Sequence, residues 1–232
     1  MYQLCIANKN YSSWSLRPWV LMQQLAIPFV EHLQPFHSPS NNAAFRMFSP
    51  TGKVPCLIDE NTIVWDSLAI TEYIAEQYIQ AWPEDKITRA WARSVCAQMH
   101  SNFNTLRQSC PMCCGLRVKI DITPELESDL FTLSKLWQEG LTRFGGPFLT
   151  GNYFTAADAF FAPIAFRVQT YDLPLEGMAM DYVQRLLSLS AMKKWYHEAL
   201  IEPWEDEQHY QQISAAGIII ADLRENKEHL IK

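Results

Sequence analysis

The stretch from Lys53 to Tyr73, KVPCLIDENTIVWDSLAITEY, most constrains the fold, because a strand, a turn, a second strand and a helix start follow one another within it. The apolar residues 54–58 predict the first strand. A proline near its head favours a strand start or an edge, since proline has no N–H for the sheet. Residues 59–61 are turn formers, and the β-branched and aromatic run 62–65 predicts the returning strand of a hairpin. The apolar residues after Ser67 have the spacing of one helix face.

Two features of this stretch predict a ligand-binding edge. If the bond between Val54 and Pro55 is cis, the backbone N–H and C=O of Val54 can face outward and pair with an extended peptide. The helix start at Asp66 and Ser67 offers free N–H groups and the positive end of a helix dipole, which suit a carboxylate. The same pattern also fits a hairpin followed by an ordinarily capped helix, so both interpretations stay open at this point.

The elements around the hairpin predict the order β-α-β-α-β-β-α. Residues 2–7 alternate in polarity and predict a strand, and a helix follows the polar loop 8–13. A second strand at 28–33 and a short helical segment at 42–47 precede the hairpin. This order gives an α/β domain with a mixed sheet and helices on its faces, a thioredoxin-like domain that we expect over residues 1–80.

A short linker rich in turn formers, 81–85, separates this domain from a second one over 86–232, which the sequence predicts to be all-helical. Helical patterns run from Ile87 to about Gln108, from Pro124 to about Arg143, from Ala156 to Gln169, from Gly177 to Leu187 and from Ala191 to Leu200. Thr155 and Asp158 fit a capping box at the start of one of these helices, with Asp in place of the usual Glu or Gln. The tail from 203 to 232 is apolar at 215–221, which predicts that it docks on the body.

Composition excludes several classes of function. Hydrophobic residues make up 48% of the chain and charged residues 19%, which is typical of a compact globular protein. The net charge of −6 and the lack of a basic run argue against nucleic acid or an anionic membrane as partner. No apolar stretch is long enough for a membrane span, and the first residues lack the pattern of a signal peptide, so we expect a cytoplasmic protein.

The cysteines predict neither a disulfide framework nor a metal site. A chain of this kind does not need disulfides, so free buried thiols are expected at Cys5, Cys56, Cys96, Cys110, Cys113 and Cys114. Cys110 and Cys113 form a C-x-x-C pattern, but it lies far from the N-terminal region where a thioredoxin-like redox pair belongs. A zinc site would also need a second pair of ligands at comparable spacing.

The hairpin and the helix after it resemble the glutathione-binding half of the soluble glutathione transferase superfamily. The family pattern is VPxL followed by a hairpin and then [D/Q/E]-S-x-A-I-x-x-Y-[I/L]. Matching positions are Lys53, Val54, Pro55, Leu57, Asp66, Ser67, Ala69, Ile70, Tyr73 and Ile74. The residues Thr155 to Asp158 resemble the [S/T]-x-A-D start of the central helix in the family's helical domain. The likeness therefore spans about residues 2–200 and leaves the tail uncovered.

This resemblance implies a binding site for glutathione as co-substrate. It implies a cis Pro55, pairing of the Val54 backbone with the cysteinyl unit, and an acidic-serine pair, Asp66 and Ser67, that holds the γ-glutamyl end. Lys53 is placed to hold the glycyl carboxylate, and His37 is a weaker candidate for the same contact. The resemblance also implies a homodimer, a small electrophilic second substrate and a role in detoxification.

A hydroxyl at the start of the first helix can donate a hydrogen bond to the glutathione sulfur, and the helix dipole favours the thiolate. The candidates are the hydroxyls of Ser12, Ser13 and Ser15, followed by that of Tyr11. Residues 11–17, YSSWSLR, resemble the zeta-class pattern S-S-C-S-x-R-V-R, in which the first serine activates glutathione. When residues 11–17 are aligned with this pattern, Ser12 matches the activating serine, and Ser13 matches the neighbouring residue that makes a polar contact. Trp14 stands where the pattern has cysteine, and Pro-Trp at 18–19 stands where it has Val-Arg. The second difference weakens the case for maleylacetoacetate isomerisation. Alternatively, these serines only cap the helix.

The second substrate is expected in a cleft between the sheet domain and the first long helix. The candidates for its wall are Trp14, Met99, His100, Phe103 and Arg107, with Arg167 and Tyr171 as further possibilities. The alternative is that these residues pack between helices. The sequence thus predicts a glutathione S-transferase that transfers the thiolate to a small electrophile or assists an isomerisation. A non-catalytic binding or regulatory module of the same fold, and a glutathione-dependent reductase or peroxidase, are the alternatives.

Overall fold

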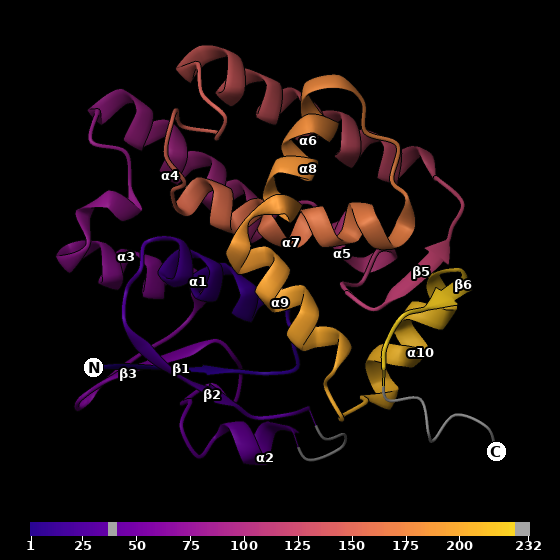
Figure 1. The fold of residues 1–232 in the computed structure, drawn as a ribbon, viewed down its shortest axis with the longest axis horizontal. Coiled ribbons are helices and arrows are strands. Elements are labelled where there is room, and N and C mark those ends of the chain that lie inside the picture. The colour runs from indigo at the N-terminus through magenta and orange to yellow at the C-terminus, as the bar shows by residue number, and fades with distance from the viewer. Residues whose placement is uncertain (37–40, 226–232) are drawn as a thin grey trace.

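The computed structural model describes residues 1–36 and 41–225 of the chain (Figure 1). In this part of the chain, four strands form one sheet in the order β2-β1-β3-β4. Strands β1 and β2 run parallel, whereas β3 pairs antiparallel with both β1 and β4. The elements are β1 (Tyr2–Ile6), α1 (Ser13–Gln24), β2 (Phe29–Leu33), α2 (Asn41–Phe45), β3 (Cys56–Asp59), β4 (Thr62–Val64) and α3 (Ser67–Gln77). Their order confirms the predicted thioredoxin-like domain.

The hairpin of β3 and β4 forms where the turn residues predict it. Leu57 lies opposite Val64, and Ile58 lies opposite Ile63. Because successive side chains of a strand point to opposite faces, this register buries Leu57 completely and leaves Ile63 exposed to solvent. The core of the domain therefore lies on the face of the sheet that Leu57 covers.

The second half of the described chain is mainly helical and surrounds one buried helix. It contains a 3₁₀ turn η1 (Ile79–Ala81), then α4 (Lys86–Ser101), α5 (Asn104–Ser109), α6 (Pro124–Phe144), α7 (Ala156–Tyr171), α8 (Gly177–Ser188), α9 (Ser190–Leu200) and α10 (Glu207–Ala216). Every residue of α7 except Gln169 is buried, as expected for a helix that is apolar on all sides. Helix α1 packs against α7 and so joins the two halves (Figure 1).

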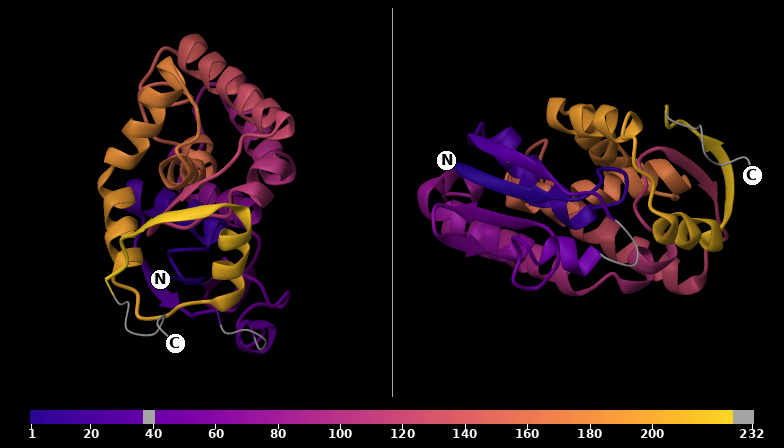
Figure 2. Two further views of the ribbon diagram at one scale, coloured as in Figure 1. Left: turned by 90° about the vertical axis from the view of Figure 1, so that its right-hand side faces the viewer. Right: turned by 90° about the horizontal axis from the view of Figure 1, so that it is seen from below.

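The structure differs from the sequence prediction in two places. The helix expected from 87 to 108 breaks after Ser101, because Phe103 has a left-handed backbone with φ of 57° and turns its side chain into the core. The helical half also contains a two-stranded antiparallel sheet of β5 (Leu116–Lys119) and β6 (Ile218–Asp222). Strand β6 belongs to the tail, which therefore docks on the body through sheet pairing (Figure 2).

The predicted capping box at the start of α7 is confirmed and extends into a buried network. The Asp158 carboxylate accepts hydrogen bonds from the backbone N–H of Thr155 and of Leu149, each at 2.9 Å. It also accepts one from the Tyr182 hydroxyl at 2.8 Å. Asp158 is fully buried, so it ties the loop before α7 and helix α8 to the core helix.

We expect Asp158→Ala to lower the free energy of unfolding by about 3 kcal/mol or more, because it leaves two backbone N–H groups and a hydroxyl buried without an acceptor. The matched control, Tyr182→Phe, removes a single donor from the same carboxylate and should cost only about 1–2 kcal/mol. Thermal or denaturant unfolding measures both variants. Equal losses would show that the carboxylate contributes no more than its bond to Tyr182.

Candidate active site

Two cavities of about 480 and 430 Å³ lie at the Val54 edge of the sheet and share the lining residues Trp14, Lys53 and Val54. The larger cavity is lined by Tyr11, Ser12, Ser13, Trp14, Phe36, Phe45, Gly52, Lys53, Val54, Arg107, Pro111, Met112, Arg167, His209 and Gln212. The smaller one is lined by Trp14, Thr51, Lys53, Val54, Pro55, Trp65, Asp66 and His100. Most of the residues that the sequence singles out therefore surround one continuous region.

The start of α1 places two hydroxyls on the wall of the larger cavity. The backbone N–H of Ser12 donates to the carbonyl of Asn8, and α1 begins at the next residue. The Ser12 hydroxyl donates to the hydroxyl of Ser15 at 2.6 Å. The Ser13 hydroxyl instead accepts a hydrogen bond of 3.4 Å from the Arg167 guanidinium. In the described part of the chain, no acceptor takes the hydrogen of the Ser13 hydroxyl.

The edge at Val54 is open to a ligand. The bond between Val54 and Pro55 is cis, as the family resemblance implies. Within residues 1–36 and 41–225, neither the N–H nor the C=O of Val54 takes part in a backbone hydrogen bond. Lys53 is exposed beside it and lines both cavities. An extended peptide would therefore find an unpaired backbone donor and acceptor here, with a cation next to them.

Asp66 and Ser67 lie at the start of α3 but in different surroundings. The Asp66 carboxylate caps the helix by accepting from the Leu68 N–H at 2.9 Å, and it lies 3.3 Å from Nε2 of His100 on the wall of the smaller cavity. Burial lowers the pKa of His100, and the Asp66 carboxylate opposes this effect. Ser67 is fully buried, and its hydroxyl accepts from Arg17 at 3.5 Å.

Three arginines surround Trp14. The Arg17 and Arg107 guanidinium carbons lie 4.1 and 5.5 Å from the centroid of its ring, and Arg167 reaches Ser13 next to it. Burial lowers the pKa of Arg17 to about 9 and that of Arg167 to about 10. Among the described residues, none of the three forms an ion pair with a carboxylate. The three guanidinium groups around Trp14 are therefore not paired with a carboxylate in the described chain.

The residues predicted for the second-substrate pocket separate into two groups. Trp14 and Arg107 line the larger cavity, and His100 lines the smaller one. Met99 and Phe103 lie in the core and line neither cavity. Met99 lies on the buried face of α4, whereas the break after Ser101 removes Phe103 from the helical spacing on which the expectation of a shared face rested. His37 lies outside the described residues.

The tail supplies wall residues that the sequence analysis missed. His209 and Gln212 of α10 line the larger cavity. The His209 ring stacks on Tyr11 with centroids 5.0 Å apart, and its Nδ1 lies 2.6 Å from the buried Asp206 carboxylate. Asp206 also accepts from the backbone N–H of His209. An Asp three residues before a His at a helix start was the available signal, but nothing in the sequence connects it to the cavity.

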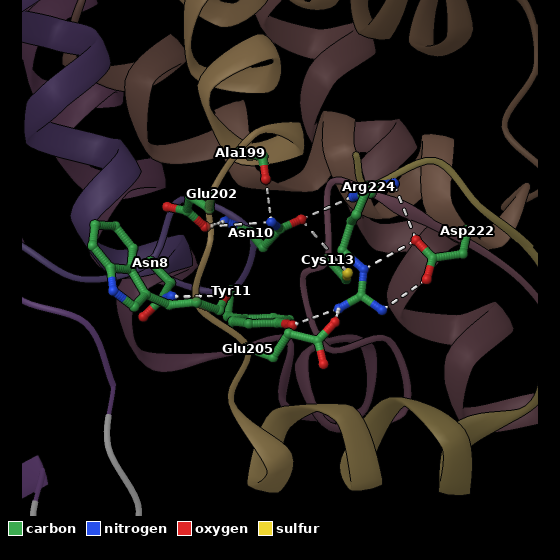
Figure 3. A network of polar contacts seen from close by, with 11 residues as sticks. Asn8, Asn10, Tyr11, Cys113, Ala199, Glu202, Glu205, Asp222 and Arg224 are labelled. Carbon is green, nitrogen blue, oxygen red and sulfur yellow. Dashed lines mark hydrogen bonds and ion pairs between the residues drawn. The ribbon is translucent and has the colours of Figure 1, made fainter. Parts of the chain in front are cut away.

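A buried polar network holds the loop before α1 in place (Figure 3). The Glu202 carboxylate accepts from the backbone N–H groups of Lys9 and Asn10 and from the Asn10 amide. Arg224 of the tail donates to the Tyr11 hydroxyl at 3.1 Å and pairs with Asp222. Burial raises the pKa of Glu202 to about 7, although the surrounding N–H donors and Lys9 lower it. The position of the two serines thus depends on contacts with the tail.

The cysteines are all free and buried. Burial raises the pKa of Cys110 to about 12 and that of Cys113 to about 11, which disfavours the reactive thiolate at the C-x-x-C pattern. Within the described residues, no cluster of His, Cys, Asp and Glu is arranged to hold a metal ion. No helix in the same part of the chain has the length and apolar character needed to cross a membrane.

Comparisons with known proteins point to one family. Residues 11–77 match the family model described as glutathione S-transferase, N-terminal domain. A search of curated proteins finds no match. Among solved structures, a glutathione transferase homolog from Burkholderia with bound glutathione is similar, with 20% identity and a TM-score of 0.66 over 85% of this chain and 97% of that one.

Two further solved structures have similar folds. A Tau class glutathione S-transferase from mango, Mangifera indica, has 16% identity and a TM-score of 0.67 over 93% of this chain and 98% of that one. Ure2p in complex with glutathione has 15% identity and a TM-score of 0.63 over 83% of this chain and 96% of that one. At these identities, the comparisons establish a fold shared with glutathione transferases, a thioredoxin-like domain followed by a helical one.

We expect the stability of the wild type to depend on pH through Glu202. Because burial raises its pKa from 4.5 to about 7, the stability that the protonated carboxyl confers is complete below the lower value and is lost as pH rises through the higher one. The full loss corresponds to about 3 kcal/mol. The variant Glu202→Gln does not titrate and lacks this loss.

Thermal unfolding of both proteins at about pH 5 and about pH 8 measures the effect. The stability advantage of the wild type over Glu202→Gln should be larger at the lower pH. An advantage that is the same at both pH values would contradict the raised pKa.

Proposed function

We propose that the protein is a glutathione transferase that stabilises the glutathione thiolate with a serine hydroxyl and transfers it to a small electrophile. The observation that carries the proposal is the convergence, around shared cavity walls, of the serines at the start of α1, the open backbone of Val54 and the Asp66 carboxylate. The N-terminal family match and the shared fold support it.

Each part of glutathione has a proposed partner. The cysteinyl backbone pairs with the N–H and C=O of Val54, because both lack an intramolecular partner in the described chain. The γ-glutamyl ammonium pairs with Asp66, and the adjacent carboxylate lies at the start of α3, near the positive end of the helix dipole. Lys53 holds the glycyl carboxylate. Ser67 supports this site from behind through Arg17.

The thiolate lies at the start of α1, where the helix dipole and a hydroxyl stabilise its negative charge. The sequence resemblance assigns this role to Ser12. The hydrogen-bond pattern favours Ser13, because the Ser12 hydroxyl already donates its hydrogen to Ser15. In the described chain, the Ser13 hydroxyl only accepts, from Arg167, so its hydrogen is available to donate to the sulfur. The Arg167 contact also makes the Ser13 hydroxyl a stronger donor, because it withdraws electron density from the oxygen.

In the transfer step, the thiol proton leaves to solvent and the sulfur attacks an electrophilic carbon. A new C–S bond forms while the bond to the leaving group breaks, and the leaving group departs with the electron pair. The protein contributes position and electrostatic stabilisation, so no protein nucleophile is required. This agrees with the raised pKa values of the buried cysteines.

Organisation and assembly are part of the proposal. We propose a glutathione-binding unit over 1–80 and a helical unit over 86–232, with the site between them. A homodimer and a cytoplasmic role in detoxification follow from the family resemblance alone. Sedimentation of the purified protein tests the dimer.

A non-catalytic binding or regulatory module of the same fold is the alternative. The retained hydroxyls, Lys53 and the Asp66 carboxylate argue against it, since a purely structural descendant does not need a complete tripeptide site. Glutathione-affinity resin tests the alternative directly: retention supports the proposal, and lack of retention favours the module. A reductase or peroxidase would instead produce glutathione disulfide.

We expect Asp66→Asn to weaken glutathione binding by about tenfold, the scale of one charged contact. Asparagine preserves the cap of α3 but removes the charge that pairs with the ammonium. The matched control is Asp85→Asn, because Asp85 caps α4 in the same way, by accepting from the Thr88 N–H at 2.7 Å. Calorimetric titration with glutathione measures both variants, and equal affinities for the two would remove Asp66 from the site.

We expect Ser13→Ala to lower kcat/KM for glutathione transfer by one to three orders of magnitude, roughly the effect of losing one oriented donor to a developing charge. Glutathione affinity should change by less than about threefold, because the tripeptide contacts remain. The comparison variant, Ser12→Ala, should lose much less activity. If Ser12→Ala has the larger loss, the hydroxyl of Ser12 is the donor, as the sequence resemblance implies.

A further inference from the structure

The wall of the larger cavity carries basic side chains, although the protein as a whole has a net negative charge. The chain has 25 acidic and 19 basic residues, yet the described wall of this cavity contains Lys53, Arg107 and Arg167 and no Asp or Glu. Cations that converge in a partly closed, low-dielectric space repel one another and attract anions. The wall is therefore complementary to a negatively charged ligand.

The hydrogen bonds of Arg107 and Arg167 also indicate a site for an anion. Arg107 donates to the carbonyl of His100 at 3.1 Å and to the side-chain oxygen of Asn104 at 2.9 Å. Asp129 raises the pKa of Arg107, but burial lowers it more, and the two residues form no ion pair in the described chain. Arg167 is buried and donates only to neutral acceptors, among them the Cys110 carbonyl. Guanidinium groups held this way lack a counter-ion, which a bound anion would supply.

Glutathione does not use all of this charge. The bound thiolate would have two carboxylates, one ammonium and the sulfur charge, a net charge of about −2. In the site proposed above, Asp66 serves the ammonium, Lys53 and the start of α3 serve the two carboxylates, and Arg167 lies behind the thiolate through its contact with Ser13. One cation on the wall of the larger cavity, Arg107, is left without a negatively charged partner in the described chain.

We propose that the electrophilic substrate has a carboxylate, and that Arg107 binds it while Trp14 packs against the body of the molecule. This inference rests on the proposed function and deepens it by naming the substrate class. Phe36, Phe45 and Met112 add apolar side chains to the wall of the same cavity. A flat unsaturated or aromatic acid with an electrophilic carbon fits both properties, because a guanidinium can bind a carboxylate with two parallel hydrogen bonds.

A suitable reactive probe is 4-chloro-3,5-dinitrobenzoate. Its methyl ester, which lacks the negative charge, is the control substrate. The glutathione thiolate attacks the carbon that bears chlorine, the C–S bond forms, and chloride leaves with the electron pair of the C–Cl bond. The thiol proton goes to solvent. We expect kcat/KM for the acid to exceed that for the ester by about tenfold or more, corrected for the uncatalysed reaction of each.

Binding is tested separately with unreactive analogues. Calorimetric titration compares 3,5-dinitrobenzoate with its methyl ester, with the protein free and saturated with S-methylglutathione. The acid should bind about tenfold more tightly than the ester, and Arg107→Gln should reduce this ratio to within about twofold. Arg107→Lys should keep part of the preference because it keeps the charge. The control Arg93→Gln removes an arginine that pairs with Glu72 on the surface and should leave the ratio unchanged.

Three outcomes would overturn the inference. They are equal binding of acid and ester by the wild type, an acid preference that persists in Arg107→Gln, and a loss of glutathione affinity in Arg107→Gln as large as the loss of acid affinity. The last outcome would assign Arg107 to glutathione. Failure of the proposed function appears differently, as no retention on glutathione resin, while the titration of the free protein still reports whether the cavity prefers the acid.

Discussion

The structure depends on how the chain satisfies a buried polar loop between its first strand and first helix. Asn8, Lys9 and Asn10 are buried, so their backbone and side-chain polar groups need protein partners. Glu202 accepts from the backbone N–H groups of Lys9 and Asn10, the Asn8 amide donates to the Trp204 carbonyl, and two glutamates bind the Lys9 ammonium. Since the serines at the start of α1 follow this loop directly, packing of the C-terminal region sets where the candidate hydroxyls lie.

Packing of the two halves also brings together the basic side chains near Trp14. Arg17 and Arg167 come from the two helices at the interface of the halves, α1 and α7, and both side chains are buried near Trp14. Desolvation lowers their pKa values, so the charged forms are costly in the unliganded protein. The thiolate and the carboxylate of the proposed ligands would relieve this cost. On that proposal, ligand binding would be coupled to electrostatic relaxation of the helix interface.

The local parts of this architecture could be predicted from the sequence. The hairpin, the helix start at Asp66 and the capping box at Asp158 each depend on neighbouring residues, whose turn and capping preferences are strong. The break at Phe103 and the pairing of β5 with β6 depend on tertiary contacts, which override helix propensity and periodicity.

The candidate site could likewise be predicted only in part. The family resemblance predicted that Ser12, Val54 and Asp66 belong to one site, and the structure places them around adjoining cavities. His209 could not be placed from the sequence, because its position depends on bonds between segments that are far apart in the sequence, such as that of Arg224 with Tyr11, which are 213 residues apart. Met99 lies within α4 on its buried face, and the sequence could not show which face of this helix turns toward the cavities.

Helix α10 and strand β6 have a consequence for how such a protein can diversify. One part of the wall of the larger cavity comes from the N-terminal half, which carries the proposed glutathione contacts, and another part from α10 in the C-terminal region. Substitutions in α10 can reshape the cavity while the N-terminal half keeps its sequence. Selection for a new electrophile therefore has a separate region of the chain to act on.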